Sequence, residues 1–250
     1  MPEALPHTPP AVALALDRLK SELSRAAGNN FAGLIVYGGV ARGRYRPGRS
    51  DVNVVVLLRD ASAAMLAAIA PALRAARRSA NVAPLILSAA EVQPAALVFP
   101  TKFLDIKDHH IVILGDDPFA SLDVPRQHVS WRIVQELRNL TLRLRHHFVA
   151  AGDDREAQMS SLARIARPLA IELTALLRLA GKPVPQEDRS ATIFQEAAAA
   201  FGVDGETLAS LAGLRQGERL KADLLALFGG VLKALAALTE QAERLKEAPQ

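Results

Sequence analysis

The sequence predicts an α+β protein, with a mixed sheet and flanking helices over residues 1–120 and a helical bundle over residues 121–250. Two observations carry this prediction. In the first part, short apolar runs bounded by turn residues alternate with helical patterns, and such runs are typical of buried strands. Beyond about residue 121, apolar residues recur only at helical spacing and the breaks fall at glycine and proline. We therefore expect two domains of different architecture.

The composition narrows the classes of protein to which the chain can belong. A length of 250 residues with 50% hydrophobic residues is enough to bury a core and too apolar for a disordered chain. The absence of cysteine excludes a disulfide framework, a thiolate metal site and a cysteine nucleophile. The net charge of +4 is modest, so the sequence does not predict a dedicated nucleic-acid-binding protein.

Neither end of the chain predicts a targeting or membrane segment. The first ten residues lack the basic and apolar regions of a secretory signal. The most apolar later stretch, 222–238, contains Asp223 and Lys233 and has the pattern of an amphipathic helix. We expect a soluble cytoplasmic protein that has no membrane partner.

The first elements follow from periodicity and turn residues. Residues 10–27 are expected to form an amphipathic helix, because their apolar residues recur every three or four positions. The turn signal Gly28–Asn30 ends that helix. The apolar run 31–37 then predicts a buried strand, which Gly38 and Gly39 interrupt.

A second strand is expected over the valine-rich residues 51–58, and an alanine-rich helix over 61–78. Arg77 and Arg78 suit the negative end of that helix. The remaining predictions for this part are a strand over 82–87, a short helix over 89–97 and strand segments over 103–107 and 111–114.

The second part predicts only helices. Residues 126–150 carry a stripe of leucine and isoleucine at helical spacing, and Trp131 is expected in the core. Further helices are expected near 154–180, 188–201, 204–212 and 218–247. The same apolar faces would serve packing within the chain or a homodimer, and the sequence does not separate the two.

The segment from Gly33 to Leu58 carries the most specific pattern. Paired glycines after a strand let the backbone approach a ligand closely. A helix beginning near Val40 would offer its free amides to a phosphate. Asp51 and Asn53 are two positions apart on a strand, so their side chains are expected on one face. Together these features indicate a phosphate site.

This segment resembles the nucleotidyltransferase superfamily, which has the DNA polymerase beta-like fold. Tyr37–Gly39 matches the start of the family pattern, and eleven residues separate Gly39 from Asp51, as in the family. Ala41–Gly43 and Ser50 are typical of small bacterial members similar to kanamycin nucleotidyltransferase. Two later segments, 107–110 and 114–118, look like those of members with a helical carboxyl-terminal domain.

The resemblance implies transfer of a nucleoside monophosphate from a nucleoside triphosphate to a hydroxyl of a small molecule or protein, with Mg²⁺ as cofactor. It places Gly38, Gly39, Arg42 and Ser50 at the nucleotide, and Asp51, Asn53 and a third residue at the metal. The best candidate for the third residue is Asp105, as metal ligand or base, from the segment expected to be a strand. Its rival is Asp108, and a structural salt bridge is the alternative for both.

One residue departs from the family pattern. Asn53 stands where the family has its second acid, and its neutral oxygen is a poorer ligand for Mg²⁺ than a carboxylate. Two functions therefore stay open: an impaired nucleotidyltransferase, and a degenerate member that binds a nucleotide or protein without catalysis. A third is a protein-interaction module, as in paired toxin–antitoxin systems built on this fold.

The other polar groups have simpler interpretations. Arg44, Arg46 and Arg49 are each more easily explained as part of a solvated loop than as phosphate ligands. The pairs His109–His110 and His146–His147 are not natural metal sites, because adjacent residues point to different sides of a strand or helix.

Overall fold

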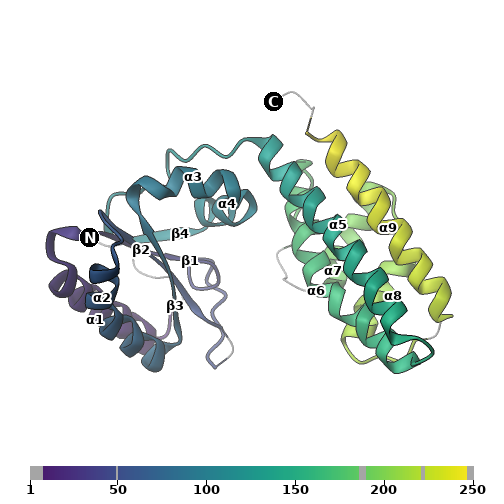
Figure 1. Ribbon diagram of the computed structural model, residues 1–250, viewed down its shortest axis with the longest axis horizontal. Coiled ribbons are helices and arrows are strands. Elements are labelled where there is room, and N and C mark those ends of the chain that lie inside the picture. The colour runs from purple at the N-terminus through teal and green to yellow at the C-terminus, as the bar shows by residue number, and fades with distance from the viewer. Residues whose placement is uncertain (1–7, 49, 186–189, 221–222, 247–250) are drawn as a thin grey trace. The chain divides into compact units, whose positions relative to one another are not determined.

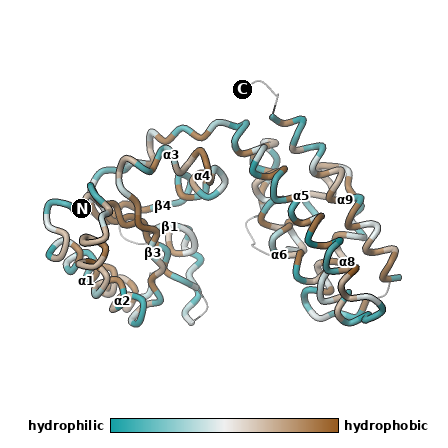
Figure 2. Tube along the Cα trace, viewed as in Figure 1, coloured by the Kyte–Doolittle hydropathy of each residue, from teal (hydrophilic) through white to brown (hydrophobic). Residues whose placement is uncertain are grey.

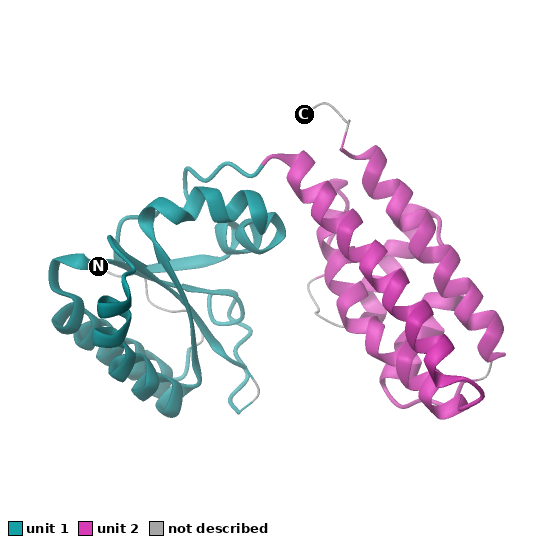
Figure 3. Cartoon of the chain, in the orientation of Figure 1, with its two compact units in different colours: residues 1–124 teal, residues 125–250 magenta. Residues whose placement is uncertain are grey.

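The computed structural model describes residues 8–48, 50–185, 190–220 and 223–246. It divides into two compact units, Met1–Val124 and Pro125–Gln250 (Figure 3). The first unit combines a sheet with helices and the second is helical, so the predicted α+β class is confirmed. Each unit has its own core and is described by itself.

The first unit is built on a four-stranded mixed sheet with the order β3-β2-β1-β4 (Figure 1). Strand β1 (Phe31–Tyr37) pairs antiparallel with β2 (Val52–Leu58) and with β4 (His110–Gly115). Strand β3 (Val82–Ser88) pairs parallel with β2. The four strands lie where the sequence predicts them, apart from shifts of one residue at their ends and Asp51, which precedes β2.

Two helices cover one face of this sheet. They are α1 (Pro10–Ala27) and α2 (Ala63–Ala80), and the short turn η1 (Gly28–Asn30) joins α1 to β1. The side chains that β1 and β2 contribute to this face are apolar and buried. Figure 2 colours the chain by hydropathy, and much of the trace of these strands is hydrophobic. They pack with the apolar stripes of the two helices. The helices contribute Leu16, Leu19, Leu23, Ile69 and Leu73, and the strands contribute Leu34, Val36, Val52, Val54, Val56 and Leu58.

The other face packs against shorter helices. After β3 the chain forms the turn η2 (Ala89–Glu91), then α3 (Val92–Val98) and α4 (Pro100–Asp108). Their core includes the alternate residues of the strands together with side chains from the segment after β4: Ile35, Val55, Leu57, Val92, Ala96, Phe103, Ile106, Phe119 and Leu122.

The expectation of a strand over 103–107 is wrong, because these residues belong to α4. Pro100 occupies the first turn of the helix, where a missing backbone N–H costs nothing. Phe103 and Ile106 are both buried and lie three positions apart, which is the spacing of a helix face. A run this short contains too few apolar residues to separate the two periods.

The second unit is a bundle of helices, as expected. Its elements are α5 (Arg126–Ala151), α6 (Arg155–Leu179), α7 (Ser190–Phe201), α8 (Gly205–Arg215) and α9 (Leu224–Arg244). Helix α5 packs against α6 and α9, and α6 also contacts α7 and α8. Asp154, Asp204 and Asp223 cap the amino ends of α6, α8 and α9 through their carboxylates.

Two details of the bundle differ from expectation. The last helix starts at Leu224, after its cap Asp223, and residues 218–220 are not helical. Residues 188–189, 221–222 and 247, which were also expected in helices, lie outside the described residues. Trp131 is 50% exposed, so it is not a core residue.

Helix α9 is long and apolar enough to cross a membrane by length and composition alone. A core helix of a bundle passes the same test, and the apolar side chains of Leu227, Val231 and Leu238 are buried inside this one.

Candidate functional site

The two glycines after β1 lie in a compact series of turns. The backbone N–H of Arg42 donates to the carbonyl oxygen of Gly38 at 3.0 Å, and that of Arg44 donates to Gly39 at 2.7 Å. Gly43, at the end of this series of turns, has a φ of 66°. The segment around Val40 forms turns and no helix begins there, so no long helix dipole is directed at a phosphate at this point of the described chain.

Gly38 and Asn53 lie against each other. Gly38 has a φ of 72°, and a Cβ at this position would lie 3.2 Å from Nδ2 of Asn53. The backbone angle therefore favours glycine, and an added Cβ would require the Asn53 amide to shift by a small amount. A Cβ on Gly39 would meet nothing within 4 Å. The chain is thus tight at Gly38 and open at Gly39, where a ligand can approach the backbone.

The start of β2 places Asn53 on the face of the sheet that carries α3 and α4. Its neighbours Val52 and Val54 are buried on the opposite face, and strand residues alternate between faces. Tyr37 lies opposite Asn53 across β1 and β2. The two motif segments around Gly38 and Asn53, which are separate in the sequence, therefore meet in the structure.

Asp51 precedes β2 and is held by a residue that the sequence does not single out. Nδ2 of Asn81 donates to Oδ1 of Asp51 at 2.5 Å, and the N–H of Val52 donates to the carbonyl oxygen of Asn81 at 3.1 Å. Asn81 caps the carboxyl end of α2 with a φ of 52°, the one positive φ of a non-glycine residue in the described ranges. The sequence does contain a signal for the cap, because an asparagine that follows the basic end of a helix is typical of such caps.

Asp105 and Arg42 form an ion pair between α4 and the glycine turn. It joins Oδ1 of Asp105 to Nη2 of Arg42, with the side chains 33% and 22% exposed. Asp105 thus reaches this region from a helix, not from the expected strand. Asp108 is exposed at the end of the same helix. The structure therefore brings Asp105, and not its rival, to the turn.

Tyr37 connects the strand pair with this ion pair. Burial raises the pKa of the Tyr37 phenol, and the negative charge of Asp105 raises it further. Asp105 is therefore close enough to act electrostatically on the residue that lies opposite Asn53. Sequence reasoning used Tyr37 only as part of the motif and assigned it no role.

Ser50 has a local partner. Its Oγ accepts the backbone N–H of Arg46 at 3.0 Å, and its own N–H donates to the carbonyl oxygen of Arg46 at 2.9 Å. These bonds close the arginine-rich loop. Arg49, which was considered as a phosphate ligand, lies outside the described residues.

These residues do not fit the carboxylate set that the family resemblance implies for Mg²⁺. Asn53 is neutral, and the parallel register puts Ala83 of β3 beside it, where a neighbouring strand would supply an acid. Asp105 already has Arg42 as its counter-ion. No group of three or more histidine, aspartate or glutamate residues is arranged to hold a metal ion within the parts of the chain that the structure describes.

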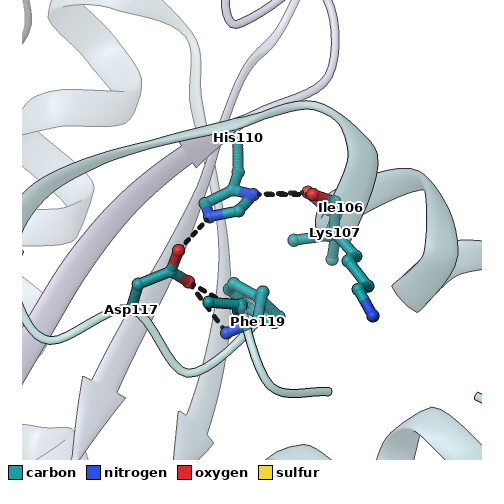
Figure 4. Close-up of polar contacts among 6 residues, drawn as sticks. Ile106, Lys107, His110, Asp117 and Phe119 are labelled. Atoms are coloured by element: carbon teal, nitrogen blue, oxygen red, sulfur yellow. Dashed lines mark hydrogen bonds and ion pairs between the residues drawn. The ribbon is translucent and has the colours of Figure 1, made fainter. Parts of the chain in front are cut away.

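His110 fastens α4, which carries Asp105, to the segment after β4 (Figure 4). Its Nδ1 lies 2.9 Å from the carbonyl oxygen of Ile106, and its Nε2 lies 3.0 Å from Oδ2 of Asp117. The other oxygen of Asp117 accepts the N–H of Phe119 at 2.8 Å.

Burial alone would raise the pKa of Asp117, but the hydrogen bonds from His110 and from the amide of Phe119 hold it below its usual value. His110 is thus a structural residue next to the site, a role that differs from the metal ligation considered for the His109–His110 pair.

The helical unit contains a second group of charged residues. Glu172 of α6 is only 9% exposed, and its Oε2 has no hydrogen-bond partner among the described residues. Burial raises the pKa of Glu172 to about 7, with Arg132 lowering it and Glu136 raising it. Arg132 itself pairs with Glu136 at 2.5 Å.

Comparison with known proteins identifies the fold. No family model and no curated protein matches the sequence. Among solved structures, the chain is similar to spectinomycin adenyltransferase AAD(9) from Enterococcus faecialis, determined with ATP and spectinomycin. The TM-score is 0.51 at 15% identity, over 92% of this chain and 99% of the other. The chain therefore has the nucleotidyltransferase fold, as the motif predicts.

Proposed function

We propose that this protein binds a nucleoside triphosphate at the turn of Gly38, Gly39 and Arg42 and transfers its nucleoside monophosphate to a hydroxyl acceptor only slowly. The observation that carries the proposal is the contact between Gly38 and Asn53. It joins the phosphate-binding turn to the position of the second acid, and that position is neutral. Binding is thus supported by the architecture, whereas the charge needed for fast transfer is reduced.

The residues have separate roles in this proposal. The open backbone at Gly39 and the Arg42 guanidinium receive phosphate oxygens, with Ser50 closing the loop beside them. Asp51, which accepts a hydrogen bond from Asn81 just before β2, would be the acid available to any Mg²⁺ that arrives with the nucleotide. Asp105 acts as the base for the acceptor hydroxyl once its pairing with Arg42 is relieved. Attack at the α-phosphorus forms the new ester bond and releases pyrophosphate.

A second candidate function is nucleotide binding without catalysis. Two specific observations favour it. Asp105 is engaged in an ion pair with Arg42, and Ala83, which cannot ligate a metal, is the residue paired with Asn53 on the neighbouring strand β3. In that case the helical unit would serve a protein partner or a second copy of the chain. For both candidates we propose a cytoplasmic protein, without nucleic acid or membrane as a partner.

The similar structure guides the choice of ligands. AAD(9) was determined with ATP and spectinomycin, so ATP is the first nucleotide to test, and hydroxyl-rich small molecules such as spectinomycin are the first acceptors. A protein hydroxyl is the other acceptor class.

The experiment measures ATP binding and pyrophosphate release in the wild type, Asn53→Asp and Asp51→Ala, each with a panel of acceptors and Mg²⁺. We expect wild-type binding, slow release, and faster release for Asn53→Asp. Loss of release in Asp51→Ala assigns the wild-type activity to this site. Binding without release in the wild type, with release only in Asn53→Asp, favours the non-catalytic candidate. If no protein binds ATP, the proposed function is wrong.

A further inference from the structure

We infer that Arg42 supplies at this site the positive charge that a carboxylate set would recruit as a metal ion, so that the nucleoside triphosphate binds without a divalent cation. This inference rests on the proposed function, because it concerns the same site. It goes further in stating which chemical form of the substrate the site accepts.

The charge of the site decides whether a triphosphate needs a metal ion in order to bind. A triphosphate is strongly anionic, so a site made of carboxylates binds it only when a cation lies between the two. Here Asn53 contributes no charge, and Ala83 stands on the adjacent strand. The triphosphate therefore meets less negative charge at this turn than at a set of acids, so less positive charge from a bound cation is needed to offset the repulsion.

The carboxylates that remain, Asp51 and Asp105, are already bonded to donors from the protein. Oδ1 of Asp51 accepts the hydrogen bond from Asn81, and Oδ1 of Asp105 is bound to Arg42. Each carboxylate thus already has a donor from the protein that stabilises its negative charge. Neither depends on a metal ion to reduce its repulsion of the ligand.

The side chain of Arg42 extends from the glycine turn. The backbone of Arg42 is bonded to Gly38, so its side chain starts within the turn that is open at Gly39. A guanidinium has five N–H donors, so it can hold Asp105 through Nη2 and a phosphate oxygen through other donors. Because the side chain is only 22% exposed, its charge is partly shielded from water and acts more strongly on a ligand.

The experiment compares ATP binding by calorimetry in Mg²⁺ and in excess EDTA. For the wild type we expect affinities within about threefold of each other, since Arg42 and not the cation provides the charge. Arg42→Gln should lose about tenfold in both buffers, the effect of removing one charge-assisted hydrogen bond. The matched control is Arg74→Gln, which removes a positive charge from an exposed position on α2 and should change neither affinity.

Asn53→Asp tests the same idea in the opposite direction. The added carboxylate should weaken binding about tenfold in EDTA, and Mg²⁺ should restore it. Asp105→Asn should strengthen binding about threefold in EDTA because it frees Arg42, whereas Asp108→Asn on the same helix should not. Circular dichroism of each variant checks that it is folded, and Asp105→Asn still tests the inference if Arg42→Gln does not fold.

The outcomes separate this inference from the proposed function. Wild-type binding that is lost in EDTA overturns the inference and leaves the proposed function standing. Equal affinities for wild type and folded Arg42→Gln, or no gain in Asp105→Asn, also overturn it. Absence of ATP binding in both buffers overturns the inference and the proposed function together.

Discussion

Each of the two units contains a notable carboxylate, and the two carboxylates differ in exposure to water and in pairing. Asp105 in the sheet unit is 33% exposed and is paired with Arg42, beside the glycine turn. Glu172 in the helical unit is 9% exposed and has an oxygen without a described partner. An accessible, paired carboxylate costs little stability and leaves its arginine partner able to contact a ligand, whereas a buried, incompletely paired one costs stability whenever it is charged. The first arrangement suits binding, and the second makes the stability of the fold depend on pH.

The largest expected effect concerns Glu172. Its pKa is raised from 4.5 in the unfolded chain to about 7 in the folded one, because burial disfavours the charged form. Folding therefore favours the protonated form of Glu172, and protonation of Glu172 in turn stabilises the fold. The resulting stability is fully present below pH 4.5 and is lost as the pH rises through 7, by about 3 kcal/mol in total.

Urea denaturation of the helical unit between pH 4.5 and 8.5 measures this loss, and Glu172→Gln should remove it. The matched control is Glu196→Gln, which changes an exposed glutamate of α7 and should keep the wild-type pH profile. A profile of Glu172→Gln identical to that of the wild type would show that Glu172 is not the group responsible.

The second effect concerns the glycine turn beside the Asp105–Arg42 pair, and tests how much each glycine contributes to the stability of the fold. Gly38→Ala requires a φ of 72° and brings a Cβ to 3.2 Å from the Asn53 amide, so we expect a loss of about 2 kcal/mol in the free energy of unfolding. Gly39→Ala meets open space and should change stability by less than about 0.5 kcal/mol. Thermal denaturation compares the two variants, and equal losses would contradict the tight turn at Gly38.

Periodicity was sufficient to predict most helices and strands, because the longer elements, such as α5 and α6, carry extended apolar faces. It failed for α4, where the short run around Asp105 fits both periods. The contact between Gly38 and Asn53 follows from the pairing of β1 and β2, which the motif implied. The bonds of Arg42 to Asp105 and of Asn81 to Asp51 join residues 63 and 30 positions apart, so they depend on tertiary packing that one sequence does not specify.

The buried charge of the helical unit could have been noticed in the sequence. Glu172 lies three positions after Leu169 and one before Leu173, so it falls on the apolar stripe of α6. A glutamate on such a stripe is a candidate for a raised pKa. The position of its charged neighbours Arg132 and Glu136, on another helix, was not predictable.

The third effect tests the claim that the Asp105 pair is weak. Removing the pair in Asp105→Asn should lower the free energy of unfolding by only about 1 kcal/mol or less, because both side chains are partly exposed to water. Asp108→Asn is the control for loss of a carboxylate from α4. Chemical denaturation of the isolated variants measures both values. A loss of about 3 kcal/mol would mean that the pair is a structural element, and the comparison with Glu172 would then fail.

The smallest effect concerns the bond that fixes α4 beside the site. The pKa of Asp117 is lowered, so its contribution to stability is present above its ordinary value of 3.8 and is lost as the pH falls below that value. Because Asp117 is 34% exposed, solvent screening limits the contribution of its pair with His110 to about 0.5 kcal/mol. Asp117→Asn keeps an oxygen for the amide of Phe119 and loses the charge next to His110.

We therefore expect Asp117→Asn to unfold at nearly the wild-type urea concentration at pH 7, with a flatter decline below pH 4. The lowered pKa of Asp117 contributes to acid destabilisation of this unit, together with that of Glu91, whereas the raised pKa of Glu172 contributes to alkaline destabilisation of the other. The Asp117 and Glu172 variants should therefore alter opposite ends of the pH profile. A single variant that flattens both ends would show that the two units do not respond independently.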